Sequence, residues 1–321
     1  MAPLNILIIG GGVAGNALAT LLLLFPLSVN DLPHITILER SAAGLSHGQN
    51  IDVRGTGIDI LRKLGVEDRV RAALTGEEGA RIVDAKNQIW CEMPADKTGK
   101  VQTGTSDVEI LRGRLTQILT DRSREVSKEV ERLGGQGIRF IVRDWLASLE
   151  QQGDRVKVVY ANSSEEESFD LVVGADGLQS STRQLAWGLR GEEERVKRLG
   201  AYCGFFSMPK GETDSLWRRW YHAPGSKSIM VRPSDQPGRS TVLMILVKDD
   251  DHRLREVAKV GRENVSRQKA LLGEYFGSSG WESERLVTEM HASDDFYYDA
   301  VAQVKMDAWS KGRVVLLGDA G

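Results

Sequence analysis

The sequence predicts an α/β fold in which a parallel sheet with helices and a small antiparallel layer carries an inserted, mostly antiparallel sheet. Two features predict this fold. Within about the first forty residues, two apolar, β-prone runs flank a helical pattern, as in parallel strands joined by a helix. Between about 197 and 291, tryptophans, turn signals and alternating apolar positions indicate antiparallel strands. A chain of 321 residues is long enough for two such units.

The N-terminal segment is expected to form a strand, a helix and a second strand. Asn5–Ile9 and His34–Leu38 are apolar runs typical of buried strands, and 14–25 between them has the composition of a buried helix. Pro26 ends the apolar run of that helix, which is too short to cross a bilayer. No basic residue precedes the run, as one would in a signal peptide. We therefore expect no transmembrane segment and a cytoplasmic location.

The rest of the chain shows further local signals. Apolar spacing predicts a helix over Thr56–Leu64, which Gly65 ends, and a longer charged helix over Glu109–Val130. Ala80–Met93 is predicted to form a hairpin. We expect two domains. The first is discontinuous and comprises 1–78, 106–190 and 300–321, and the second comprises 79–105 and 191–299.

Composition excludes several classes of function. The net charge of −3 lacks the basic excess of a nucleic-acid-binding protein. The two cysteines, Cys91 and Cys203, lie far apart in sequence, so no disulfide framework is indicated. The five histidines are scattered without zinc-like spacing. We therefore predict no metal site and no nucleic-acid partner.

The first chemical motif is a glycine turn, G-x-G-x-x-G over residues 10–15, between the first strand and its helix. Gly10 permits the tight turn. Gly12 lets the backbone approach a pyrophosphate without a Cβ in the way, and Gly15 lets the helix pack closely on the strand. The motif in this context predicts the phosphate-binding turn of a dinucleotide site.

Two features flanking the turn complete the predicted site. The helix N-terminus at Val13 and Ala14 offers free N–H groups and a positive dipole end to phosphates. Glu39 lies at the end of the second strand, 24 residues beyond Gly15. A carboxylate there accepts hydrogen bonds from a ribose diol. Together they predict a Rossmann-like pocket for the ADP half of a dinucleotide.

Two later segments have the form of a short buried strand that runs into a turn rich in glycine and aspartate. The first contains Asp176, and the second contains Gly318 and Asp319. Because the carboxyl ends of parallel strands line the ligand crevice of such sheets, we expect both turns at the dinucleotide site. Asp319 would present its carboxylate or its backbone N–H to a polyol such as a ribityl chain.

Three segments resemble, in their order along the chain, three signatures of one family. They are the glycine turn with Glu39 and Arg40, the segment around Asp176 and the segment around Asp319. The family is that of the group A FAD-dependent monooxygenases, the para-hydroxybenzoate hydroxylase-like aromatic hydroxylases. The stretch 109–115 adds a fourth match, because the family has a FAD-contacting arginine at the position of Arg112.

The stretch 48–55, which contains Gln49, resembles the loop near the flavin ring in the same family. The likeness is greatest for the tetracycline-inactivating and fungal secondary-metabolite branches. In the family, a loop and a long helix follow the third signature. The chain stops at Gly321, inside that signature, so we expect the sequence to be a piece of a longer monooxygenase, with a naturally shortened form as the alternative.

The resemblance implies FAD as cofactor and NADPH or NADH as co-substrate. In the family, reduced flavin captures O2 as a C4a-hydroperoxide and passes one oxygen to an aromatic or polyketide-like small molecule. The resemblance also implies that Glu39 and Arg40 hold the adenosine end, Arg112 the middle of FAD, and Asp319 the ribityl chain or the pyrophosphate. Two alternatives stay open, namely an FAD-dependent oxidoreductase of the same fold without hydroxylase activity and an inactive dinucleotide-binding remnant.

The sequence identifies no catalytic base. Arg54 is a weak candidate for a group beside the flavin or the substrate, and an ordinary surface arginine is the alternative. Tyr221 is a second weak candidate, in an aromatic and basic cluster with Trp217, Arg219 and His222. Alternating positions of that strand would face a flat substrate or pack within the sheet.

Overall fold

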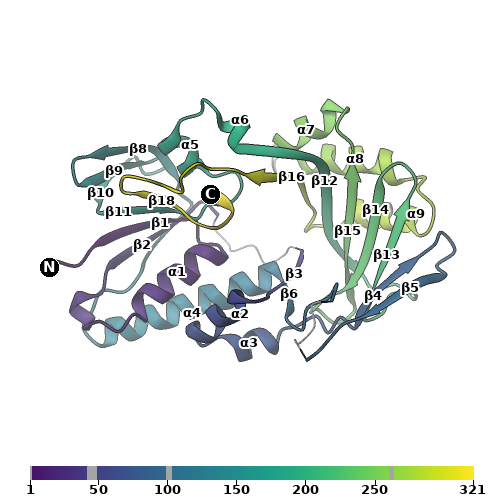
Figure 1. The fold of residues 1–321 in the computed structure, drawn as a ribbon, viewed down its shortest axis with the longest axis horizontal. Coiled ribbons are helices and arrows are strands. Elements are labelled where there is room, and N and C mark those ends of the chain that lie inside the picture. The colour runs from purple at the N-terminus through teal and green to yellow at the C-terminus, as the bar shows by residue number, and fades with distance from the viewer. Residues whose placement is uncertain (1, 42–48, 99–102, 260–263) are drawn as a thin grey trace.

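The computed structural model describes residues 2–41, 49–98, 103–259 and 264–321, and it has the predicted α/β architecture. Figure 1 shows a mainly parallel sheet at one end of the molecule and a larger antiparallel sheet at the other. The long strand β12 (Val196–Pro209) leads from the first region into the second.

The mainly parallel sheet has the strand order β17–β18–β11–β1–β2–β7. Its two central strands, β11 and β1, are apolar apart from Asn5 at the start of β1, because helices cover one face of the sheet and an antiparallel layer covers the other. Within this sheet, as far as the structure describes the chain, β17 is the one strand that pairs antiparallel. The bounds are Ser310–Lys311 for β17, Val314–Leu316 for β18, Leu171–Gly174 for β11, Asn5–Ile9 for β1, His34–Glu39 for β2 and Arg139–Val142 for β7.

Alternation along β1 divides its side chains between two layers. Ile6 and Ile8 pack under α1 (Val13–Leu23) and α4 (Arg112–Arg132). Leu7 and Ile9 pack against a three-stranded antiparallel meander on the opposite face. This meander is the predicted small antiparallel layer, formed by β8 (Leu146–Gln152), β9 (Arg155–Tyr160) and β10 (Glu166–Phe169).

The larger sheet has seven strands in the order β16–β12–β15–β14–β13–β4–β5. One of its faces packs against α7 (His252–Lys259), α8 (Val265–Phe276) and α9 (Ser283–Ala292) through a buried apolar core. The strands other than β12 are β16 (Tyr297–Val304), β15 (Arg239–Val247), β14 (Lys227–Pro233), β13 (Trp217–Ala223), β4 (Gly79–Val83) and β5 (Ile89–Pro94).

Short elements connect the two regions. A two-stranded sheet, β3 (Asn50–Asp52) with β6 (Glu109–Leu111), lies between them, as Figure 1 shows. The remaining helices are α2 (Thr56–Leu64), α3 (Glu67–Arg71), α5 (Ser181–Trp187) and α6 (Glu192–Arg195).

Several predicted elements are confirmed, and two boundaries were wrong. The helix 56–64 ends at Gly65 in the left-handed conformation (φ +69°), as expected of a C-cap. The long helix begins at Arg112 rather than Glu109, because the β-prone residues before it pair with β3. The first helix ends at Leu23 rather than at residue 25, since the residue before Pro26 is disfavoured in a helix. The domain boundaries stay a prediction. Strand β16 continues across the boundary predicted between residues 299 and 300.

Candidate functional site

The glycine turn has the close contacts that its sequence implies. Gly10 has φ +106°, and a Cβ there would lie 2.3 Å from the carbonyl oxygen of Ala175. A Cβ at Gly15 would lie 1.9 Å from the carbonyl oxygen of Gly10. A Cβ at Gly12 would have no heavy atom of the described chain within 4 Å. The protein itself therefore requires glycine at 10 and 15, whereas the space beside Gly12 is left open.

That open space lies at the N-terminus of α1. Gly12 is the N-cap residue and offers no side chain to the helix, and the first turn contains no acidic residue. The N–H groups at a helix start have no partner within the helix and carry the positive end of its dipole. The site is therefore suited to an anion such as a pyrophosphate.

Glu39 lies at the carboxyl end of β2, beside the glycine turn. Its Oε2 accepts a hydrogen bond from the Gly11 N–H (2.8 Å), and its Oε1 accepts one from the Ser41 N–H (2.7 Å). A carboxylate oxygen has further acceptor capacity, so Glu39 keeps room for the ribose diol. Arg40 is exposed directly after it.

The three glycine-containing segments meet in the structure. The position of a Cβ at Gly10 is 3.0 Å from the Asp176 Cα, which places the second segment against the first. A Cβ at Gly318 would lie 3.3 Å from the Ala14 Cβ, which places the third segment against the start of α1. Asp319 is exposed in a short 3-10 turn there.

Arg183 joins two of these segments. From the sequence we expected the stretch 176–183 at the dinucleotide site, without a role of its own for Arg183 at its end. It is fully buried, and it donates to the Ala320 carbonyl oxygen (2.7 Å) and to the Leu178 carbonyl oxygen (2.8 Å). Its charge is balanced by Glu192 at 2.7 Å. The signal that could have found it is a basic residue in a polar segment directly after a buried strand.

Asp176 has a structural task for its carboxylate. Its two oxygens accept hydrogen bonds at the start of α5 from the Ser180 and Ser181 hydroxyls and from the N–H and hydroxyl of Thr182. The part of Asp176 that lies beside Gly10 is its backbone. A cofactor role for Asp176 stays a prediction, and its carboxylate is already in use within the protein.

Arg112 and Gln49 are brought together by the β3–β6 pair. Arg112 is the first residue of α4, and its N–H donates to the Gln49 carbonyl oxygen (2.9 Å). The Arg112 side chain is half-buried. Gln49 immediately precedes β3 and reaches a cavity between the two regions. Of the stretch 48–55, Gly48 lies outside the described part of the chain.

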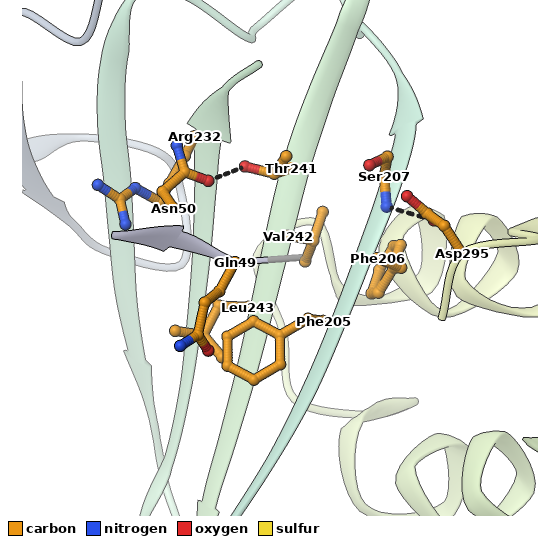
Figure 2. Close-up of a pocket in the computed structure, with 10 residues that line it drawn as sticks. All are labelled: Gln49, Asn50, Phe205, Phe206, Ser207, Arg232, Thr241, Val242, Leu243 and Asp295. Atoms are coloured by element: carbon orange, nitrogen blue, oxygen red, sulfur yellow. Dashed lines mark hydrogen bonds between the residues drawn. The ribbon is translucent and has the colours of Figure 1, made fainter. Parts of the chain in front are cut away.

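This cavity, called the pocket below, has a volume of about 120 Å³. Figure 2 shows polar side chains toward one side and the Phe205 ring and Leu243 beside Gln49. The Asn50 side chain accepts a hydrogen bond from the Thr241 hydroxyl (2.8 Å). The residues that line the pocket are Gln49, Asn50, Phe205, Phe206, Ser207, Arg232, Thr241, Val242, Leu243 and Asp295.

A charged cluster lies at the polar side of the pocket. Arg232 donates to Glu77 through Nε (2.8 Å), and its Nη2 also contacts Glu109. Both carboxylates are almost completely buried. Burial raises the pKa of Glu109, and the charge of Arg232 opposes that rise. Because Glu109 belongs to β6 and Arg232 to β14, the cluster joins the β3–β6 pair to the large sheet.

The two weak catalytic candidates lie apart from each other. Arg54 donates to Asp52 and to the Thr103 carbonyl oxygen, both at 2.9 Å, so its guanidinium is held by a near neighbour and by a segment 49 residues further along the chain. Tyr221 is buried in the core between the large sheet and its helices, and it donates to the Ser279 carbonyl oxygen (2.9 Å). The structure therefore brings Tyr221 to the helix-covered face and not to the pocket.

Comparison with known proteins decides the family. The sequence profile of a family described as "FAD binding domain" matches residues 4–321. The chain belongs to the FAD-binding monooxygenase family. The FAD-dependent monooxygenase asL6 of Sarocladium schorii is 36% identical, over 99% of this chain and 74% of the relative. Monooxygenase CTB7 of Cercospora beticola is 31% identical, over 99% of this chain and 72% of the relative.

Solved structures agree with this assignment. The crystal structure of the tetracycline destructase Tet(55) matches this flavin monooxygenase with a TM-score of 0.78 and 28% identity, over all of this chain and 74% of that one. HpxO of Klebsiella pneumoniae, solved with FAD and uric acid, matches with a TM-score of 0.67 at 16% identity and so shares the fold.

The residues of this monooxygenase fit FAD. The turn leaves room beside Gly12, α1 begins there without an acidic side chain, and Glu39 stands at the end of β2. Within the described ranges, no three metal-ligating side chains gather into a possible metal site. None of the helices in the part of the chain that the structure describes has the length and apolar character needed to cross a bilayer.

Proposed function

We propose that this monooxygenase hydroxylates a flat aromatic or polyketide-like small molecule, with NADPH or NADH as reductant and O2 as the source of the oxygen. The observation that carries the proposal is the uncovered face of the large sheet, which lies opposite the helix-covered face and lines the pocket with aromatic and apolar side chains.

Strand register extends a row of side chains along this face from the pocket residues Phe205 and Leu243, which are paired with each other. Across β13, β14, β15, β12 and β16, residues paired with one another fall on the same face of the sheet. The paired positions in this row are Trp220, Met230, Leu243, Phe205 and Tyr297. All but Met230 are only half-buried, in contrast to the neighbouring residues that point into the helix-covered core. A row of partly exposed rings suits the face of a planar substrate.

The adjacent row is polar and would orient the substrate. Arg232, Thr241 and Ser207 are paired across β14, β15 and β12. They stand next to Gln49 and Asn50 at the edge of the pocket. Hydroxyl, amide and guanidinium groups beside an apolar row can bind oxygen substituents and so set which ring position faces the flavin.

The cofactor roles are part of the proposal, and the family resemblance and the geometry of the turn support them. Gly12 and Val13 would donate N–H groups to the pyrophosphate, Glu39 would accept from the adenosine ribose, and Arg112 would contact the middle of FAD. Asp319 would bind the ribityl chain or the pyrophosphate. When bound, FAD supplies the redox chemistry, by accepting a hydride and activating O2.

The test uses the full chain loaded with FAD. NADPH or NADH oxidation is measured with and without planar phenols and aromatic polyketides, and the product is analysed after reaction under labelled ¹⁸O2. We expect substrate-stimulated oxidation and incorporation of one labelled oxygen atom into the product. A converted product without the label would contradict monooxygenation and indicate an oxidoreductase of another type.

A further inference from the structure

Asn16 is a buried amide directly behind the glycine turn. It lies in the second turn of α1, its exposure is 1%, and it faces α4. Polar side chains are buried at this level only when their hydrogen bonds are satisfied. The partners of Asn16 therefore indicate what its amide does.

Every polar atom of the Asn16 side chain is used. Nδ2 donates to the carbonyl oxygens of Gly11 (2.5 Å) and Gly12 (3.1 Å), and it also lies 3.1 Å from the Thr120 hydroxyl. Oδ1 accepts from the Ser123 hydroxyl (2.9 Å). The amide thus bridges two carbonyl groups of the turn to two hydroxyls of α4.

These two contacts determine where the turn's N–H groups point. In a planar trans peptide the C=O of one residue and the N–H of the next point in opposite directions. Because Asn16 holds the Gly11 and Gly12 carbonyls toward the protein interior, the N–H groups of Gly12 and Val13 point away from it. Among the described residues neither N–H has a hydrogen-bond acceptor, and the Gly12 side is open.

We propose that Asn16 is a positioning residue, which holds the glycine turn so that the Gly12 and Val13 N–H groups are aimed at the pyrophosphate before FAD binds. The Thr120 and Ser123 hydroxyls of α4 hold the Asn16 amide. Helix α4 thus contributes to cofactor binding from the interior side of the glycine turn. An isosteric apolar side chain would fill the same space and remove the side-chain donor of the Gly11 carbonyl. The Gly12 carbonyl would keep the backbone N–H of residue 16, which donates to it at 3.1 Å. The turn would then lose the orientation of its donors, although its glycines are unchanged.

The test measures binding in the full chain with Asn16→Leu, which has a similar volume. FAD release on dilution of the holoenzyme is followed by flavin fluorescence, and ADP and adenosine are then titrated as competitors. We expect FAD and ADP to bind at least about tenfold more weakly, a change of about 1.4 kcal/mol. Adenosine, which lacks the pyrophosphate, should compete as it does with the unchanged protein.

Two further variants protect the test against misfolding. Ser123→Ala removes one anchor of the amide, and we expect a smaller loss of ADP affinity in the same direction. Ser127→Ala is the matched control, because Ser127 is an equally buried hydroxyl of α4 that binds the Ile138 N–H instead. It should change the free energy of unfolding without changing the ratio of ADP to adenosine affinity.

The outcomes separate the proposal from ordinary packing. If Asn16→Leu lowers the melting temperature but binds ADP as tightly as before, the amide only fills the core, and the proposal is wrong. Equal losses for ADP and adenosine would also overturn it, because they would show a general distortion. If Asn16→Leu does not fold, an unchanged ADP-to-adenosine ratio in Ser123→Ala would reject it.

Discussion

The glycine turn and the pocket form the two ends of the proposed site, and they are built differently. The turn is formed mainly by backbone atoms of six consecutive residues, 10–15. The pocket is formed by side chains from separate segments, among them Gln49, Phe205 and Arg232. A backbone site depends on which residues lack a side chain, whereas a side-chain site depends on strand register and on packing between distant segments.

The largest expected effect is at the turn. Gly15→Val would place a Cβ 1.9 Å from the Gly10 carbonyl oxygen, and backbone atoms on both sides cannot move apart without separating α1 from β1. We expect the free energy of unfolding to fall by more than about 3 kcal/mol, despite the better helix propensity of valine. Chemical denaturation and FAD content are the measurements. A stable variant with normal FAD content would show that the turn tolerates side chains as the pocket does.

The next effect concerns the charged cluster beside the pocket. Arg232→Met would leave the buried Glu77 and Glu109 without their principal cation. Removing one partner of a buried ion pair typically lowers stability by about 3–5 kcal/mol, and we expect a loss of that order at neutral pH. Arg232→Lys serves as the control, and we expect it to keep part of the stability that Arg232→Met loses.

We expect the loss of stability caused by Arg232→Met to depend on pH. Burial holds the pKa of Glu109 above its ordinary value of 4.5. A carboxyl with a raised pKa in the folded state contributes most to stability at low pH, and the contribution declines as pH rises above 4.5. Losing Arg232 removes an interaction that lowers this pKa. The stability difference between Arg232→Met and the unchanged protein should therefore shrink from pH 8 toward pH 5, and a constant difference would contradict the assignment.

A third change separates cofactor binding from folding. A Cβ at Gly12 meets nothing within 4 Å in the described chain, so Gly12→Ala should fold normally. The methyl group would enter the space proposed for the pyrophosphate. We expect an unchanged melting temperature of the FAD-free protein and at least about tenfold weaker FAD binding, by fluorescence titration. Normal FAD affinity would place the pyrophosphate elsewhere.

The last change compares the pocket wall with the core behind it. Phe205 is half-buried on the uncovered face, whereas its neighbour Phe206 is 3% exposed in the helix-covered core. Phe206→Ala should lower the free energy of unfolding by about 3–5 kcal/mol. Phe205→Ala should lower it by only about 1 kcal/mol, yet raise KM for the aromatic substrate and increase H2O2 release. An unchanged KM would remove Phe205 from the proposed substrate face.

The fold was largely predictable because its signals are local. The β1–α1–β2 unit and the helix 56–64 follow from apolar spacing and glycine positions in short windows. The start of α4 was placed too early, because the pairing of Glu109–Leu111 with β3 involves a segment more than fifty residues away (Asp52 pairs with Glu109). Tyr221 shows the same limit, since alternation identified two faces of β13 without indicating which one the helices cover.

The sequence by itself determined the parts of this protein that the backbone makes. Gly10, Gly12, Gly15 and Glu39 indicated a dinucleotide turn, because glycine spacing and one carboxylate at a strand end are properties of a continuous segment. Only the tertiary structure showed that Asn16 is buttressed by α4, and that Arg232 meets carboxylates from β6 and from the segment before β4. Those contacts join segments far apart in the chain, and their geometry exists only once the helices and sheets have packed.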